Sequence, residues 1–211
     1  MTTMTAEVTL PPAGEPFTVE DLGRMPDDGH RYELIDGTLM VSAAPNLPHQ
    51  RVATMLGFLL ERACPADLIV FGAEVNLRLN STSEVLPDFC VARAEDAVGV
   101  RFTTPPLMVG EVLSPDSVLR DLNLKKAAYE RFSVPSYWVI DPDLDKPGLR
   151  VFEFDGACYK EVAHVTGDEA FRAERPFPVE IVSAQLVDKL RRASPQYSPG
   201  GTTPRTPRRG G

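Results

Sequence analysis

Two carboxylates in apolar segments, and a lysine in the helix predicted to follow them, are the residues of this chain best suited to chemistry. Asp88 follows Pro87 in the segment VLPDFCVA, and Glu111 lies near the end of the segment PLMVGEVLS. A charged group in an apolar strand is costly unless it is paired or binds a metal ion. Two such carboxylates together with Lys125 would suffice to hold a divalent cation beside a phosphodiester.

The position of Lys125 on the helix predicted over residues 118–132 distinguishes it from an ordinary surface lysine. At 100° per residue, Lys125 falls in the middle of an apolar arc and Asp121 at its edge, whereas Lys126 lies on the polar side. The arc is formed by Val118, Leu122, Ala128, Tyr129 and Phe132. Two interpretations without chemistry stay open: an ion pair with Asp121 one turn away, and a lysine stem that lies along the apolar face with its ammonium group in solvent.

Two further ionisable residues share faces with apolar neighbours. In the segment RYELIDGTLMVSAAP, strand alternation places Glu33 on an apolar face, which is unusual for a solvated carboxylate. His49 lies in the first turn of a helix predicted over residues 46–64, on its apolar stripe. Glu33 could instead pair with Arg31 or Arg51, and a histidine in such a position is more often a hydrogen-bonded core residue.

The predicted elements indicate one α/β domain, a mixed β-sheet core flanked by helices with additional β-hairpins. Helices are expected over residues 17–25, 46–64, 118–132 and 183–192. Strands are expected in a hairpin over residues 31–45 that turns at Asp36-Gly37, and over residues 68–71, 74–79, 85–92, 106–114, 134–141, 149–154, 158–164 and 178–182. Residues 80–84 are predicted to form a turn. If the strands that carry Asp88 and Glu111 are neighbours, both carboxylates come within reach of Lys125.

Composition sets the expected limits of the domain. Residues 1–16 and 194–211 are rich in Pro, Gly and Thr, which predicts a disordered N-terminus and a flexible tail around a single domain over residues 17–193. No apolar stretch approaches the roughly 20 residues that span a bilayer, so no membrane partner is expected. The three cysteines, Cys64, Cys90 and Cys158, are odd in number, far apart and next to apolar residues, which favours buried free thiols in a reducing cytoplasm.

The formal net charge of −8 limits the kinds of partner that the chain can bind tightly. Neutralisation of phosphates by Lys and Arg dominates nonspecific affinity for nucleic acids. An acidic chain is therefore a poor nonspecific binder of DNA or RNA. A local basic cleft, or a contact bridged by a metal ion, is compatible with this charge.

Six segments of the chain, taken in their order, resemble those of a known family. They are YELIDG, PNLPHQR, LPDF, GEVLSP, RDLNLKKAAYE and VPSYWVIDP. This set is similar to the Uma-type restriction endonuclease family, a domain family of unknown function within the PD-(D/E)XK nuclease superfamily. The resemblance covers roughly residues 17–190. It implies a restriction-endonuclease-like fold and DNA as the partner.

The resemblance also implies roles for individual residues. Asp88, Glu111 and the main-chain carbonyl of Val112 would bind Mg²⁺ or Mn²⁺. The usual lysine of the signature stands two residues after the glutamate, where this chain has Leu113, and Lys125 on the following helix would replace it. Further members of the site would be an accessory acid, Glu33, and the nearby polar residues His49 and Tyr129. Asp121, which the helical wheel places at the edge of the arc, is a further candidate.

The reaction implied is metal-assisted hydrolysis of a phosphodiester in DNA, with a homodimer as the default assembly. Lys125 would orient or deprotonate a water molecule, or stabilise the pentavalent state, and desolvation is expected to lower its pKa. Two alternatives suit the acidic charge. One is a non-catalytic module of the same fold that binds nucleic acid or protein, and the other is a hydrolase of small phosphoesters.

Overall fold

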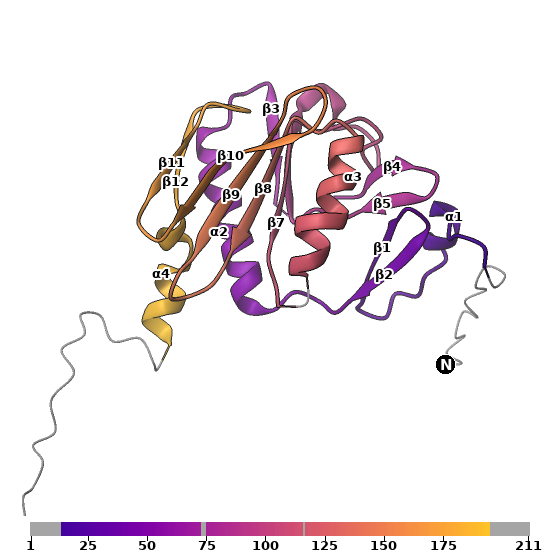
Figure 1. Cartoon of the computed structure of the whole chain (residues 1–211), viewed down its shortest axis with the longest axis horizontal. Coiled ribbons are helices and arrows are strands. Elements are labelled where there is room, and N and C mark those ends of the chain that lie inside the picture. Colours follow the sequence, from indigo (N-terminus) through magenta and orange to yellow (C-terminus); the bar gives the residue numbers. More distant parts are fainter. Residues whose placement is uncertain (1–13, 73–74, 116, 195–211) are drawn as a thin grey trace, which may run out of the picture.

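A mixed central sheet (Figure 1) positions both candidate carboxylates, with Glu111 inside one strand and Asp88 directly before the neighbouring strand. In the computed structural model, which describes residues 14–72, 75–115 and 117–194, this sheet has six strands in the order β10-β9-β8-β7-β6-β3. β7 and β8 run parallel, and the other neighbours run antiparallel. The strands are β3 Leu68–Phe71, β6 Phe89–Arg93, β7 Met108–Val112, β8 Ser136–Asp141, β9 Gly148–Phe154 and β10 Tyr159–Thr166.

A smaller antiparallel sheet packs beside the central one and has, among the described residues, four strands in the order β2-β1-β5-β4. They are β1 Arg31–Ile35, β2 Thr38–Ser42, β4 Leu77–Asn80 and β5 Ser83–Val85. Asp36 and Gly37 join β1 to β2 with φ angles of 50° and 75°. Two positive φ values at the centre of a two-residue loop are the geometry of a type I′ turn, as the Asp-Gly pair predicts.

Helices cover both faces of the central sheet (Figure 1). One face carries α2 and α4 together with the β11–β12 hairpin, and the other face carries a π-helical segment, η2, that continues into α3. The bounds are α1 Val19–Leu22, α2 Leu47–Ala63, the short 3₁₀ turn η1 Ala94–Asp96, η2 Arg120–Lys125, α3 Lys126–Arg131, β11 Ala170–Ala173, β12 Val179–Val182 and α4 Ser183–Ala193.

Strand alternation divides the buried side chains into two cores. Val91 and Met108 belong to the core against α2, whereas Cys90 and Val109 belong to the core against α3. Side chains two residues apart along a strand share a face. The side chain of Glu111, two residues after Val109, therefore points toward the face that carries η2 and α3.

The predicted fold class, a mixed sheet flanked by helices with additional hairpins, is confirmed. The turn predicted over residues 80–84 is wrong in part, because β5 begins at Ser83. The single strand predicted over residues 85–92 is also wrong, because β5 ends at Val85, β6 begins at Phe89, and Asp88 lies in the connection between them. The short strand β11 was not predicted. The cysteines are free, as expected, although only Cys90 is buried. Most of the predicted N-terminal and C-terminal extensions, and the start of the strand expected over residues 74–79, lie outside the described residues. Within the described part of the chain, no helix combines the length and apolarity needed to cross a membrane.

Close packing between β6 and β7 generates the first prediction. Phe89 lies opposite Gly110, and a Cβ atom at residue 110 would stand 1.8 Å from Cζ of the Phe89 ring. We expect Gly110→Ala to reduce the free energy of unfolding by about 2–3 kcal/mol, since overpacking forces the ring and strand apart. Urea unfolding followed by circular dichroism measures this loss.

Gly57→Ala is the matched control, because its nearest atom, in Gly72, is 3.8 Å from the added Cβ and the site is helical. Alanine should be neutral or stabilising there, by up to about 1 kcal/mol. Equal urea midpoints for Gly110→Ala and the wild type would contradict the packing described for Phe89.

Candidate functional site

The register of β6 and β7 brings the two candidate carboxylates together. Phe89 pairs with Gly110, so the next residues outward along the two strands are Asp88 and Glu111. The main-chain N–H of Asp88 donates to the carbonyl of Gly110 at 3.0 Å, which extends the pairing to this position. Both side chains are buried, with exposed fractions of 6% and 2%, and both line a cleft of about 400 Å³.

Three donors hold the carboxylate of Asp88. His49 Nε2 lies 2.9 Å from Oδ2, Arg31 Nη1 lies 3.1 Å from Oδ1, and the main-chain N–H of Val112 donates to Oδ2 at 2.8 Å. Burial alone raises the pKa of Asp88. The hydrogen bond and attraction from His49, with smaller contributions from Lys125 and Val112, outweigh burial and lower the pKa to about 2.

Lys125 lies between two glutamates. Its Nζ is 2.8 Å from Oε1 of Glu33 and 3.0 Å from Oε1 of Glu111, and its side chain is 2% exposed. The alternative in which the ammonium group reaches solvent is therefore wrong. In the part of the chain that the structure describes, the ion pairs of Lys125 are with these glutamates, and Asp121 instead faces Arg120 Nε at 3.4 Å.

The expected depression of the Lys125 pKa is wrong. Burial does lower this pKa, but the charges of Glu111 and Glu33, followed by those of Asp121 and Asp88, more than offset burial and raise it above its ordinary value of 10.5. Desolvation alone would lower the pKa of Lys125, but the fold gathers carboxylates around the amine that reverse the direction of the shift. Lys125 therefore stays protonated at neutral pH.

The two glutamates that share Lys125 have different surroundings. Glu33 also accepts the main-chain N–H of Leu86 at 2.8 Å, and although burial raises its pKa, the charge and hydrogen bond of Lys125 lower it overall. Glu111 accepts the hydroxyl of Tyr129 at 2.6 Å, and burial together with repulsion from the neighbouring carboxylates raises its pKa well above 4.5.

The π-helical geometry of η2 aligns Asp121 with Lys125. The buried side chains over residues 117–131 are those of Ser117, Asp121, Lys125, Ala128 and Tyr129. The prediction that Lys125 faces inward is confirmed. However, Asp121 is buried at 1% exposure where the 100° wheel put it at the edge, and Val118 is 37% exposed where the wheel put it inside. A π turn has more residues than an α turn, which rotates the inward face relative to that wheel.

The cleft brings together nearly all of the predicted site residues. Lining it are Glu33, His49, Asp88, Glu111, Val112, Asp121 and Lys125. Tyr129 does not line the cleft, but its hydroxyl donates a hydrogen bond to Glu111, which does. Sequence reasoning gave no site role to Arg31 or Arg120, which also line the cleft. Arg31 could have been found, because it stands two residues before Glu33 on the same strand and so shares its face.

Carboxylate oxygens are the ligands that Mg²⁺ and Mn²⁺ prefer, so the donor types of the cleft fit such an ion. Lys125 and Tyr129 both bond Oε1 of Glu111, and neither uses Oε2. The N–H of Val112 points to Asp88, and in an extended strand the carbonyl of the same residue points to the same side. Over the described residues, no group of three or more His, Cys, Asp or Glu side chains is arranged to hold a metal. A metal site made of two carboxylates and a main-chain carbonyl does not require three such side chains.

Similarity to known proteins identifies the family. The family model Uma2, described as "Putative restriction endonuclease", matches residues 19–187. The chain belongs to the Uma2 family. This match confirms the resemblance drawn from the sequence motifs and supports nucleic acid as the class of substrate. None of the curated proteins matches this Uma2 chain.

A solved structure supports the fold. It is from Anabaena variabilis ATCC 29413 and is described as a putative nuclease belonging to DUF820. The two chains share 17% sequence identity with a TM-score of 0.65, over 83% of this chain and 99% of that chain. At this level of identity the similarity concerns the fold, and the roles of individual residues in the Uma2 chain rest on its own geometry.

The ion pairs of Lys125 predict a large effect on stability. Lys125→Met leaves Glu33 and Glu111 buried without their cation, so we expect the free energy of unfolding at pH 7 to fall by about 3–5 kcal/mol. The loss should shrink as the pH falls, because the unpaired glutamates have raised pKa values in the folded variant and bind protons there first. Urea unfolding between pH 7 and pH 5 measures both effects.

Lys126→Met is the matched control for this prediction. Lys126 is only half-buried and its Nζ lies 4.5 Å from the centre of the Phe152 ring, so its loss should cost about 1 kcal/mol or less. Similar losses for the two variants at pH 7 would show that Lys125 carries no buried pair.

The low pKa of Asp88 predicts an acid-labile contribution to stability. The pKa is about 2 in the folded protein against 3.8 for an ordinary aspartate. The stabilisation, about 2 kcal/mol, is complete above pH 3.8 and is lost as the pH falls through 2. Since asparagine resembles the protonated acid, the stability difference between the wild type and Asp88→Asn should shrink by this amount from pH 5 to pH 2. Urea unfolding across this range measures it, and a constant difference would refute the assignment.

Proposed function

We propose that this protein is a metal-dependent endonuclease that hydrolyses phosphodiester bonds in DNA. The observation that carries the proposal is the convergence of Asp88, Glu111 and Lys125 from three elements in one cleft. The description of the Uma2 family as a restriction endonuclease family supports the same reaction class. Function depends on the site and not on the fold alone, so the argument rests on these three side chains.

The carboxylates of Asp88 and Glu111 and the carbonyl of Val112 would hold Mg²⁺ or Mn²⁺. An ion of this type commonly uses one or two carboxylates and completes its shell with water and substrate phosphate. When bound, it would supply positive charge to the phosphate and lower the pKa of a water molecule. The remaining contributions come from the side chains of the chain itself.

Lys125 would act as a cation and hydrogen-bond donor. The carboxylates around it raise its pKa, so a role as general base is disfavoured and stabilisation of charge on the phosphoryl oxygens is favoured. Glu33 would position the ammonium group through its 2.8 Å contact. His49 and Arg31 would hold Asp88 in the same way, and Tyr129 would orient Glu111.

A non-catalytic binding module is the second candidate function, and one observation favours it. Every carboxylate named above already has a cationic partner within the cleft, and the chain as a whole carries a net charge of −8. A site of this kind could be a structural ion-pair network. The two candidates differ in whether metal-dependent cleavage exists and depends on Asp88, Glu111 and Lys125.

The test is cleavage of supercoiled, linear, single-stranded and branched DNA in Mg²⁺ and in Mn²⁺. We expect cleavage by the wild type that stops in a chelator. Asp88→Asn, Glu111→Gln and Lys125→Met should each reduce the rate by about 100-fold or more, because each removes a charge at the reacting phosphate. Each variant is first checked for folding by circular dichroism.

Glu84→Gln is the matched control for the cleavage assay. Glu84 is also a buried, ion-paired acid, 2.6 Å from Arg78, but it lies outside the carboxylate cleft. Its variant should keep the wild-type rate. Cleavage that survives in the three site variants would reveal a contaminant, and a wild type that cuts none of the substrates would favour the binding module.

A further inference from the structure

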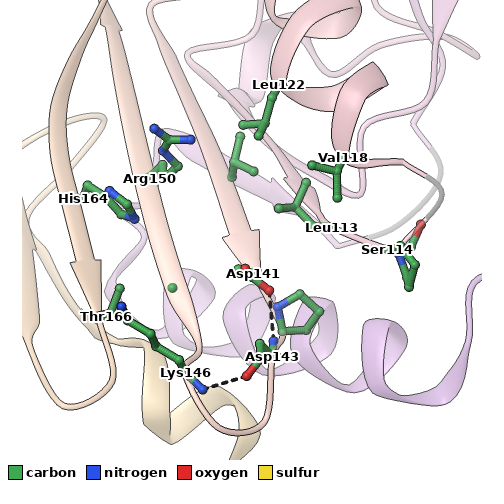
Figure 2. A pocket seen from close by; sticks show the side chains of 14 residues that line it. Leu113, Ser114, Val118, Leu122, Asp141, Asp143, Lys146, Arg150, His164 and Thr166 are labelled. Atoms are coloured by element: carbon green, nitrogen blue, oxygen red, sulfur yellow. Dashed lines mark hydrogen bonds between the residues drawn. The ribbon is translucent and has the colours of Figure 1, made fainter.

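A second cavity, of about 560 Å³, lies beside the carboxylate cleft on the same face of the central sheet. Figure 2 shows its two sides. Val118 and Leu122 of the helical segment, with Leu113 below them, form an apolar side. Arg150 and His164 project from β9 and β10 on the opposite side.

The cavity adjoins the cleft. Ser114 and Pro115, which follow β7 directly after the Glu111 segment, line both spaces. A ligand whose phosphate lies beside Asp88 and Glu111 could therefore place an adjoining group in the cavity.

The polar groups of the cavity argue against a phosphate as that adjoining group. Lys146 and Arg150 are accompanied by Asp141 and Asp143, which line the same space. Arg150 also pairs with Glu161, outside the cavity lining, at 3.0 Å. The two cations of the lining are thus matched in number by two carboxylates of the lining, and Arg150 has a further carboxylate partner. A flat, uncharged group with both donors and acceptors fits this mixture better than an anion does.

The apolar side of the cavity also suits a flat, uncharged group. Val118 is 37% exposed, and Leu122 is half-buried, so both present hydrocarbon to the cavity. The volume falls within the range of small-molecule sites. Nucleobases bind proteins by stacking on aromatic or apolar side chains and by hydrogen bonds along their edges.

The acidic net charge of the chain is a reason to expect contacts with nucleobases. A chain of charge −8 gains little nonspecific affinity from phosphates, so contacts to the bases must supply more of the binding free energy. We propose that this cavity receives an unpaired nucleobase of the substrate strand, next to the phosphodiester in the cleft. The preferred substrate is then a nucleic acid with at least one unpaired nucleotide at the cleavage site. This inference rests on the proposed function.

The test measures binding and not cleavage. Fluorescein-labelled single-stranded DNA and the blunt duplex of the same sequence are titrated with the protein in Ca²⁺, and the DNA is checked afterwards for cuts. We expect the wild type to bind the single strand more tightly than the duplex. Val118→Asp should weaken binding of the single strand by about tenfold, the scale of one base contact.

Leu119→Asp is the matched control. Leu119 is the next residue, 80% exposed, and does not line the cavity, so this variant adds the same charge without changing the wall. It should bind as the wild type does. A second pair repeats the comparison: His164→Ala should weaken binding, whereas His30→Ala should not. The two histidines have similar side-chain exposures, 52% and 50%, and His30 lies outside the cavity.

The outcomes separate this inference from the proposed function. Equal effects of Val118→Asp and Leu119→Asp, or duplex binding as tight as single-strand binding, would overturn the inference even if the wild type cleaves DNA. Selective loss in Val118→Asp and His164→Ala would support it. If that loss accompanies a complete lack of cleavage in Mg²⁺ and Mn²⁺, the nucleobase site stands and the nuclease reaction does not.

Discussion

The ion pair that Lys125 makes with two glutamates is the interaction on which the arrangement of the cleft depends. Glu33 comes from β1 of the smaller sheet, Glu111 from β7 of the central sheet, and Lys125 from η2. A buried charge without a partner costs several kcal/mol, so the three elements must stay in contact for any of these groups to remain charged. The same strand β1 also supplies Arg31 to Asp88. The two sheets therefore meet at the site through charges as well as through apolar contacts.

This arrangement is not the one that stability alone would favour. Replacing a buried ion pair with well-packed apolar residues is often neutral or stabilising, because desolvation consumes much of the attraction between the charges. The site contains four acids, Glu33, Asp88, Glu111 and Asp121, all at least 94% buried. The segment that carries Lys125 also adopts a π turn, a geometry that is rare overall and frequent at functional sites. Both features are more readily explained by a chemical role than by folding.

The sequence predicted which residues meet in the cleft better than it predicted the electrostatics of the cleft. Asp88, Glu111 and Lys125 were recognisable because a charge among apolar neighbours violates the local pattern, and such violations mark functional sites. Strand pairing in the register that joins Asp88 to Glu111 could be assumed but not proved, because it depends on contacts between distant segments. The raised pKa of Lys125 was unpredictable for the same reason, since Glu33, one of the acids that causes it, is far away in the sequence. A helical wheel that assumes a constant 100° per residue could not predict the π turn.

The balance of charge in the cleft determines what a phosphate would meet there. Arg31, Arg120 and Lys125 each have a carboxylate partner, so none of the three is held ready for an anion. A phosphate entering alone would face four nearby acids and would gain little. A divalent cation bound to Asp88 and Glu111, as we propose, would reverse this balance, because it would neutralise the two acids and weaken their hold on Arg31 and Lys125. The ammonium group could then turn toward the phosphate while Glu33 still anchored it. In this view the ion pairs neutralise the buried acids until the metal ion and the substrate bind together.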